Sequence, residues 1–112
     1  MKRRDGNESL KIADEKLKIA YDFLIKLSEL PDFSKDDKWT ITSSRIFIKD
    51  INEKEKDKKS AERLNKIYAS LYHILPSLNR NSESYILIYN TLENIDGGSS
   101  AIWDFLLPAY IK

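Results

Sequence analysis

Apolar residues recur along the first thirty positions at alternating steps of three and four, which is the spacing of one face of a helix. Charged residues occupy many of the positions between them. Ser9 precedes the stripe as a candidate N-cap, and Pro31 follows it as a stop signal. The pattern therefore predicts an amphipathic helix from Ser9 to Leu30. Its apolar positions are Leu10, Ile12, Ala13, Leu17, Ile19, Ala20, Phe23, Leu24, Leu27 and Leu30.

Residues 39–51 fit two patterns. The alternation of Trp39, Ile41 and Ser43, among many β-branched and aromatic residues, is typical of a strand. The same stretch also has an apolar helical face, and no second segment offers a strand that could pair with it. We therefore expect a helix from about Thr40 to Lys54. Its inner face would hold Ile41, Ser44, Ile48 and Ile51, with Phe47 beside them.

A third helix is expected from Ser60, a candidate cap, to about Leu78. Pro76 lacks the amide proton that would bond to the preceding turn, so the helix should kink or end there. The run of alternating acids and lysines before this helix, residues 53–59, is typical of a solvated helix end. A lipid-headgroup contact is disfavoured there because the acids cancel much of the attraction. The apolar face comprises Leu64, Ile67, Tyr68, Leu71, Ile74, Leu75 and Leu78.

A fourth helix is expected after Ser82, which is placed to cap it. Residues 96–98, Asp-Gly-Gly, should end this helix with a left-handed turn. Its inner face would hold Tyr85, Ile88, Tyr89, Leu92 and Ile95. The tyrosines of the last two helices (Tyr68, Tyr72, Tyr85 and Tyr89) have two interpretations: core residues whose hydroxyls reach the rim, or a recognition surface.

The C-terminal segment is unusually apolar. Residues 101–111 are apolar at every position except Asp104 and Pro108, and they follow a predicted hinge at Gly97 and Gly98. Ser99 or Ser100 could cap one or two helical turns here, which Pro108 would end. Each large side chain gains about 1.5–3 kcal/mol on burial, so the segment should dock on its own domain, on a partner or on a membrane. The candidate partner-binding residues are Trp103, Phe105, Leu106, Leu107, Tyr110 and Ile111.

Four amphipathic segments joined by short connections predict an all-α fold, an antiparallel four-helix bundle. We expect a single domain over residues 1–112. Residues 1–8 would form a flexible start, and residues 99–112 a hinged hydrophobic segment that packs back on the bundle as a short helix or tail.

Charge and composition narrow the function. The net charge is +1, but residues 39–80 carry 9 basic and 5 acidic groups and residues 81–112 carry 1 and 4. We see no concentrated basic face, so no nucleic-acid partner is expected. The chain has no cysteine. It has no apolar run of about 18–20 residues that could span a bilayer. No apolar stretch follows its basic start, so we expect no signal peptide. These features favour the cytoplasm.

Candidate chemistry is sparse. His73 is the lone histidine; Ser70 and Ser77 are spaced to reach it on a helix, but no oxyanion device accompanies them. Asp14, Glu15 and Asp22 lack the Glu-x-x-His pairs of carboxylate metal bundles. The Gly97-Gly98 pair has no phosphate-binding lysine beside it. We expect no catalytic residue, no metal and no cofactor.

The order of these elements resembles the immunity proteins of class II bacteriocins. The resemblance rests on a basic start, a long first helix, helices through residues 61–72 and 84–92, and a Gly-rich hinge before a Trp-containing tail at residues 97–103. It implies a cytosolic bundle, with association at the inner face of the membrane left open, that protects its host from a pore-forming peptide by stoichiometric recognition. The partner would be the bacteriocin, its membrane receptor (a sugar transporter), or their complex. Specificity would lie in the fourth helix, the hinge, and the Trp103–Ile111 tail.

Two alternatives remain open. The chain could be a small helical adaptor or inhibitor, for example phage-encoded, that inserts Ile102, Phe105 and Leu106 into a groove of a host protein. It could instead be a structural bundle whose tail forms the seam of a homodimer, so that both a monomer and a weak homodimer are compatible with the sequence.

Overall fold

The apolar stripe of the first thirty residues is buried in helix α1, which runs from Gly6 to Ser28. The computed structural model describes the backbone of residues 6–110 and the side chains of residues 8–107. Helix α1 begins three residues before the expected cap, so Ser9 lies inside the helix with its side chain buried. Residues 6–8, expected in a flexible start, therefore belong to α1, and residues 1–5 lie outside the described residues.

The segment with two possible patterns is helical. Helix α2 runs from Lys35 to Glu53, and the structure contains no strand between residues 6 and 110. Ser34 caps it, because the Asp37 N–H donates to Ser34 Oγ at 3.2 Å. The helical interpretation is thus confirmed, and α2 buries the face expected for it: Ile41, Ser44, Ile48 and Ile51.

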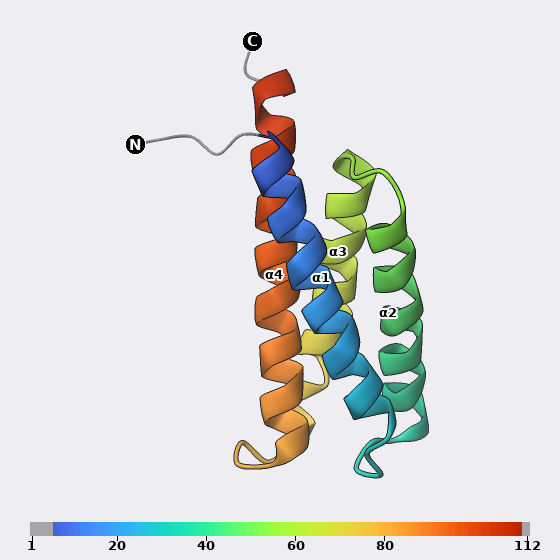
Figure 1. Ribbon diagram of the computed structural model, residues 1–112. Helices are drawn as coiled ribbons and strands as arrows, with labels where there is room; N and C mark the ends of the chain where they lie inside the picture. The colour runs from blue at the N-terminus through green and yellow to red at the C-terminus, as the bar shows by residue number, and fades with distance from the viewer. Residues whose placement is uncertain (1–5, 111–112) are drawn as a thin grey trace.

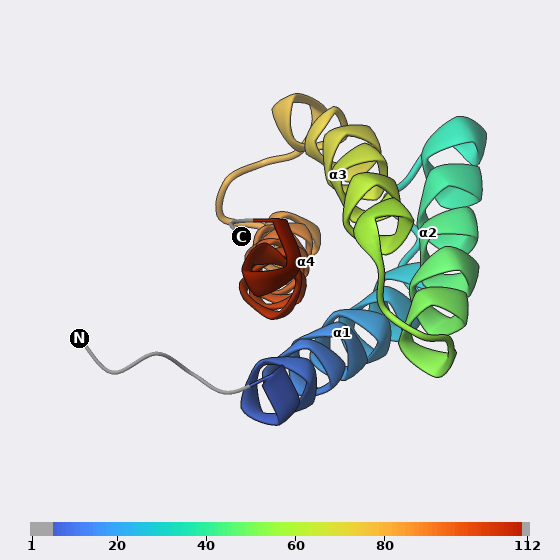
Figure 2. The same cartoon turned by 90° about the horizontal axis from the view of Figure 1, so that it is seen from above.

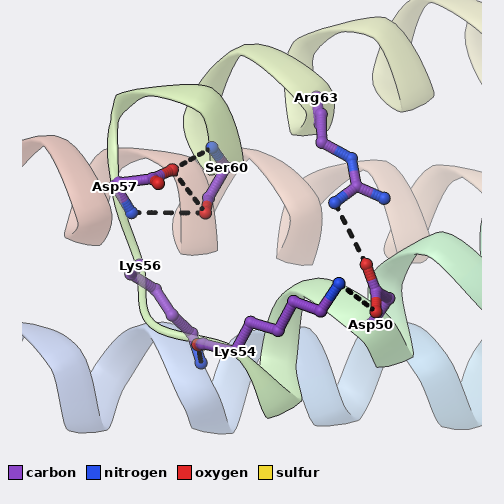
Figure 3. Close-up of polar contacts among 6 residues, drawn as sticks. All are labelled: Asp50, Lys54, Lys56, Asp57, Ser60 and Arg63. Carbon is purple, nitrogen blue, oxygen red and sulfur yellow. Dashed lines mark hydrogen bonds and ion pairs between the residues drawn. The ribbon is translucent and has the colours of Figure 1, made fainter.

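The connection between α2 and α3 is closed by a capping box (Figure 3). Helix α3 runs from Lys58 to Tyr72, and its N-cap is Asp57 rather than the expected Ser60. The Ser60 N–H donates to Asp57 Oδ1 at 2.9 Å, and the Asp57 N–H donates back to Ser60 Oγ at 3.2 Å. These bonds stabilise the carboxylate, so the backbone N–H and then the hydroxyl of Ser60 hold the pKa of Asp57 below its ordinary value.

A nearly buried lysine joins the same connection to α1. Lys56 Nζ donates to the carbonyl oxygens of Asn52 at 2.6 Å and Lys54 at 3.1 Å, and it lies 2.9 Å from Asp14 Oδ1. The ammonium group therefore satisfies carbonyls that the end of α2 leaves without helical partners. It also pairs with α1, so Asp14 has a structural partner rather than a purely solvated role.

Pro76 separates α3 from α4, as the sequence predicts. Helix α3 ends at Tyr72, six residues before the expected end, and Pro76 lies in the short 3₁₀ helix η1 (Leu75–Ser77). Helix α4 begins at Glu83, and the Tyr85 N–H donates to Ser82 Oγ at 3.2 Å. The predicted cap at Ser82 is therefore confirmed.

Helix α4 continues without a break from Glu83 to Tyr110. The expected stop at Gly97 and Gly98 is therefore wrong, and so is the separate tail helix capped by Ser99 or Ser100 and ended by Pro108. Within the described range no glycine has a positive φ. The physical reason is packing: a Cβ atom at Gly98 would lie 2.9 Å from Leu17 Cδ2 on α1, so glycine lets the two helices approach closely. The two glycines lie within a helix and do not join two helices.

The four helices form the predicted antiparallel bundle (Figure 1). Seen along the bundle, α1 lies between α2 and α4, and α3 closes the ring between α2 and α4 (Figure 2). The α1–α4 contact is the most extensive between two helices, and the α2–α3 contact is much smaller. Over residues 6–110, we find no helix that combines the length and apolar character needed to cross a bilayer.

Candidate functional site

The main candidate for recognition is a groove between α3 and α4 that we call the tyrosine groove. Its volume is about 540 Å³. Tyr72 and Tyr89 are each about half exposed, whereas Leu75 and Leu92 are buried. The groove therefore has an apolar floor and aromatic walls with hydroxyls near solvent. Its lining residues are Tyr68, Tyr72, Leu75, Pro76, Leu78, Arg80, Tyr85, Tyr89, Leu92 and Glu93.

The geometry of one wall follows from helix spacing. Tyr68 and Tyr72 are four residues apart on α3, so their rings lie on one face. The ring centroids are 6.3 Å apart with an angle of 13° between the planes. The end of the groove is set by η1, because the turn around Pro76 brings Leu75 and Leu78 under the tyrosines. Tyr68 and Tyr85 pack on the core, as the first interpretation expects, whereas Tyr72 and Tyr89 are exposed.

The unbroken α4 extends this surface toward the C-terminus. Tyr85 and Trp103 are eighteen residues apart, as are Tyr89 and Leu107. Eighteen residues make five helical turns, so each pair shares a face of α4, about 27 Å apart along its axis. A stripe of exposed residues lies between: Ile86, Tyr89, Glu93, Asp96, Ser100 and Leu107. The tyrosine groove and the C-terminal end are therefore parts of one surface, which we call the α4 stripe.

The predicted partner-binding residues fall into two groups. Trp103, Phe105 and Leu106 are partly buried, with Trp103 and Leu106 packed against the core, and Leu107 is exposed. Tyr110 is the last residue of α4, with a side chain outside the described ones, and Ile111 lies outside the described residues. The structure thus brings Trp103 to Leu107 onto the same rigid helix as Tyr89.

Ile102 and Ala101 are core residues. Both are buried, and both belong to the single hydrophobic core of the bundle. The inner face of the C-terminal segment is therefore buried, and only its outer face reaches solvent. Ile102 is consequently unavailable as the first anchor of a helix inserted into a host-protein groove.

The residues examined for chemistry have structural roles or lie in solvent. The hydroxyl of Ser70 donates to the Lys66 carbonyl at 3.0 Å, and the hydroxyl of Ser77 donates to the Ile74 carbonyl at 2.8 Å. His73 is exposed at the C-terminal end of α3. Over residues 6–110, no group of three or more His, Asp or Glu side chains is placed to hold a metal ion.

Sequence reasoning missed a second exposed region, on α2. Trp39 is 73% exposed, more than any other large hydrophobic side chain described. It forms one wall of a groove of about 470 Å³ between α2 and α3, with Phe47 and Arg63 among its other walls. The signal was present in the helical spacing: Trp39 lies two residues before Ile41, outside the stripe that α2 buries.

The chain was compared with protein-family models, with curated proteins and with solved structures. No family model matches, and neither curated proteins nor solved structures give a significant match.

Proposed function

We propose that the protein is an immunity protein that protects its host from a class II bacteriocin by binding the peptide, its membrane receptor, or the complex of the two. The α4 stripe is the observation that carries this proposal. It presents Ile86, Tyr89 and Leu107 as exposed apolar side chains on one helix, with the polar residues Glu93, Asp96 and Ser100 between Tyr89 and Leu107. Exposed aromatic anchors surrounded by polar residues are typical of interaction sites. The order of the four helices also resembles that family, whereas the Gly-rich hinge and separate tail that the resemblance included are part of a continuous α4 here.

Charge indicates which kind of partner the α4 stripe suits. Residues 81–112 carry one basic and four acidic groups. Two of the acids, Glu93 and Asp96, are exposed along the stripe between Tyr89 and Leu107. An acidic surface with apolar anchors favours a basic, amphipathic peptide, since complementary charges increase the rate of encounter and fix the orientation of the partner.

The adaptor or inhibitor alternative is less well supported. It depends on Ile102 as the first of three spaced anchors, and that side chain is fully buried. The genes beside this one offer a simple discriminator: a short bacteriocin precursor gene supports immunity, whereas phage genes support an inhibitor.

Point variants in a sensitive bacterial strain test the proposal. We expect wild-type protein to protect cells against a cognate bacteriocin, and Tyr89→Ser and Leu107→Ser to lower the tolerated bacteriocin concentration at least about tenfold, because loss of an interface anchor costs about 2 kcal/mol or more. Ile19→Ser is the matched control, because Ile19 is similarly exposed but lies on α1. Protection by both stripe variants at the wild-type level, with all proteins equally abundant, would refute the role of α4.

A further inference from the structure

The outer face of α2 carries three large apolar side chains that are each about half exposed or more. Trp39 is 73% exposed, Ile46 57% and Phe47 46%. Trp39 and Ile46 are seven residues apart and therefore lie on nearly the same side of the helix, with Phe47 turned toward α3. The inner face of α2 is already buried in the bundle, so these three side chains are not an incompletely packed core.

Basic side chains flank this apolar strip on both sides. Along α2, residues 38–49 include Lys38, Arg45 and Lys49 and contain no acid. Across the groove, Arg63 and Lys66 of α3 line the wall that Phe47 shares. We call the strip and its flanking cations the α2–α3 face: Lys38, Trp39, Arg45, Ile46, Phe47, Lys49, Arg63 and Lys66.

The acids of α2 lie at its two ends, with Asp36 and Asp37 at the start and with Asp50 and Glu53 at the finish. Asp36 and Asp37 are in the first turn of α2, where they interact favourably with the helix dipole. At the other end, Asp50 lies 3.0 Å from Lys54 Nζ and 3.1 Å from Arg63 Nη1 (Figure 3). Hydrogen bonds from Lys54 and then Arg63 hold the pKa of Asp50 below its ordinary value. The centre of the face therefore presents cations and apolar groups.

Positive and negative charge are distributed unequally between the helices of the bundle. Residues 39–80, which include most of α2 and all of α3, carry a net charge of +4, whereas residues 81–112 carry −3. Figure 2 shows α2 across the bundle from α4, with α3 adjacent to both. The basic face thus points away from the acidic α4 stripe, so one partner could occupy each.

We propose that the α2–α3 face binds the surface of an anionic lipid bilayer. Trp39, Ile46 and Phe47 would enter the headgroup region, while the flanking lysines and arginines contact lipid phosphates. Tryptophan with aliphatic neighbours and a basic border is the pattern of interfacial helices, and clustered cations are attracted to anionic lipids. This inference rests on the α2–α3 face and not on the proposed immunity function.

A single-stranded nucleic acid fits the face less well. Bases stack on exposed aromatic rings, but the Arg63 guanidinium already lies 5.5 Å from the centre of the Phe47 ring. Ile46, the second most exposed large hydrophobic side chain among those described, offers no ring for a base. A bilayer makes use of all three apolar side chains, which is why it is the favoured partner.

Vesicle binding tests the proposal with the full chain and without any bacteriocin. The Trp103→Phe variant leaves Trp39 as the sole tryptophan, so its fluorescence reports on this face alone. With vesicles of phosphatidylcholine containing roughly one-third phosphatidylglycerol, we expect the emission to shift to the blue and the protein to sediment with lipid. Pure phosphatidylcholine vesicles should bind far less, and raising salt from about 0.05 to about 0.5 M should release the protein.

Substitutions on the face separate this proposal from a general affinity for lipid. In the Trp103→Phe protein, Ile46→Ser should weaken binding to anionic vesicles about tenfold. The double substitution of Lys38→Glu and Lys49→Glu should weaken it by a similar factor. Ile19→Ser, on α1 and 41% exposed, should bind as wild type does. The circular dichroism spectra of all variants should match, because each substituted side chain is exposed.

Several outcomes would overturn the proposal. These are absence of binding to anionic vesicles, equal binding to neutral ones, and equal losses for Ile46→Ser and Ile19→Ser. Tighter binding to oligo-dT than to vesicles would assign the face to nucleic acid instead. A wild-type dimer that Ile46→Ser converts to a monomer, without vesicle binding, would assign it to a second copy of the chain. A negative result here leaves the protection assay on α4 unaffected.

Discussion

Gly98 on α4 and Leu17 on α1 are packed so closely that a Cβ atom at position 98 would lie 2.9 Å from Leu17 Cδ2 and 3.1 Å from Leu17 Cγ. Leu17 is fully buried, so its side chain has little room to move aside. The adjacent Gly97 differs, since its Cβ would meet only the flexible Lys16 side chain, at 3.4 Å. Two neighbouring glycines in one helix therefore have different roles.

Gly98→Ala should destabilise the fold by roughly 1–2 kcal/mol, because the clash with Leu17 outweighs the stabilisation from the higher helix propensity of alanine. Gly97→Ala should stabilise it by about 0.4–1 kcal/mol, since alanine reduces the freedom of the unfolded chain and meets no rigid neighbour. Urea unfolding followed by circular dichroism measures both values. In a Leu17→Ala background the cost of Gly98→Ala should shrink, and the same sign for both single variants would contradict this account.

The C-terminal part of α4 should divide into a core face and a surface face. Ile102→Ala should cost about 2–5 kcal/mol of unfolding free energy, because its side chain is fully buried in the core of the bundle. Leu107→Ala should change it by no more than about 0.5 kcal/mol. Deletion of residues 101–112 would remove Ile102, so truncation should reduce the helical content. If Ile102→Ala and Leu107→Ala lowered the unfolding free energy by similar amounts, the outer face would also be part of the core.

Lys56 should contribute more to stability than its ion-pair partner. Lys56→Ala removes the donor that two carbonyls at the end of α2 share, and should cost about 1–3 kcal/mol. Asp14→Asn should cost less than about 1 kcal/mol, because the Asp14 side chain is half exposed and the amide oxygen can still accept the bond. Chemical denaturation of both variants at neutral pH provides the comparison. If both variants lost the same unfolding free energy, the stabilisation by Lys56 would come from its ion pair with Asp14 and not from its hydrogen bonds to the two carbonyls.

Asp57 should make part of the stability dependent on pH. The Ser60 N–H and hydroxyl lower its pKa below the ordinary value of 3.8, so the ionised form favours the folded state. This contribution is complete above the pKa of the unfolded chain, and it disappears as the pH falls through the lower pKa of the folded state. Asp57→Asn keeps an acceptor but does not titrate in this range. The gap between the urea midpoints of wild type and Asp57→Asn should therefore be widest above about pH 5 and narrow below about pH 3. A gap independent of pH would contradict a role for the ionised carboxylate.

The sequence by itself determined that the chain forms four amphipathic helical segments, because their signals are local. The spacing of Leu17, Ala20 and Leu24 identifies a buried helical face wherever the rest of the chain lies, and Pro76 and Ser82 mark an end and a start through their own backbone chemistry. For the same reason residues 39–51 could be assigned to a helix once no partner for a strand was found.

Only the tertiary structure decided what the ambiguous signals mean. Asp96-Gly97-Gly98 reads locally as a helix end, yet the contact of Gly98 with Leu17, eighty-one positions earlier in the chain, favours a continuous α4. The exposure of Trp39 and the burial of Lys56 likewise depend on which helices become neighbours, which no local pattern encodes. The candidate surfaces on α4 and on the α2–α3 face exist because side chains separated along the chain share a face only after the helices pack.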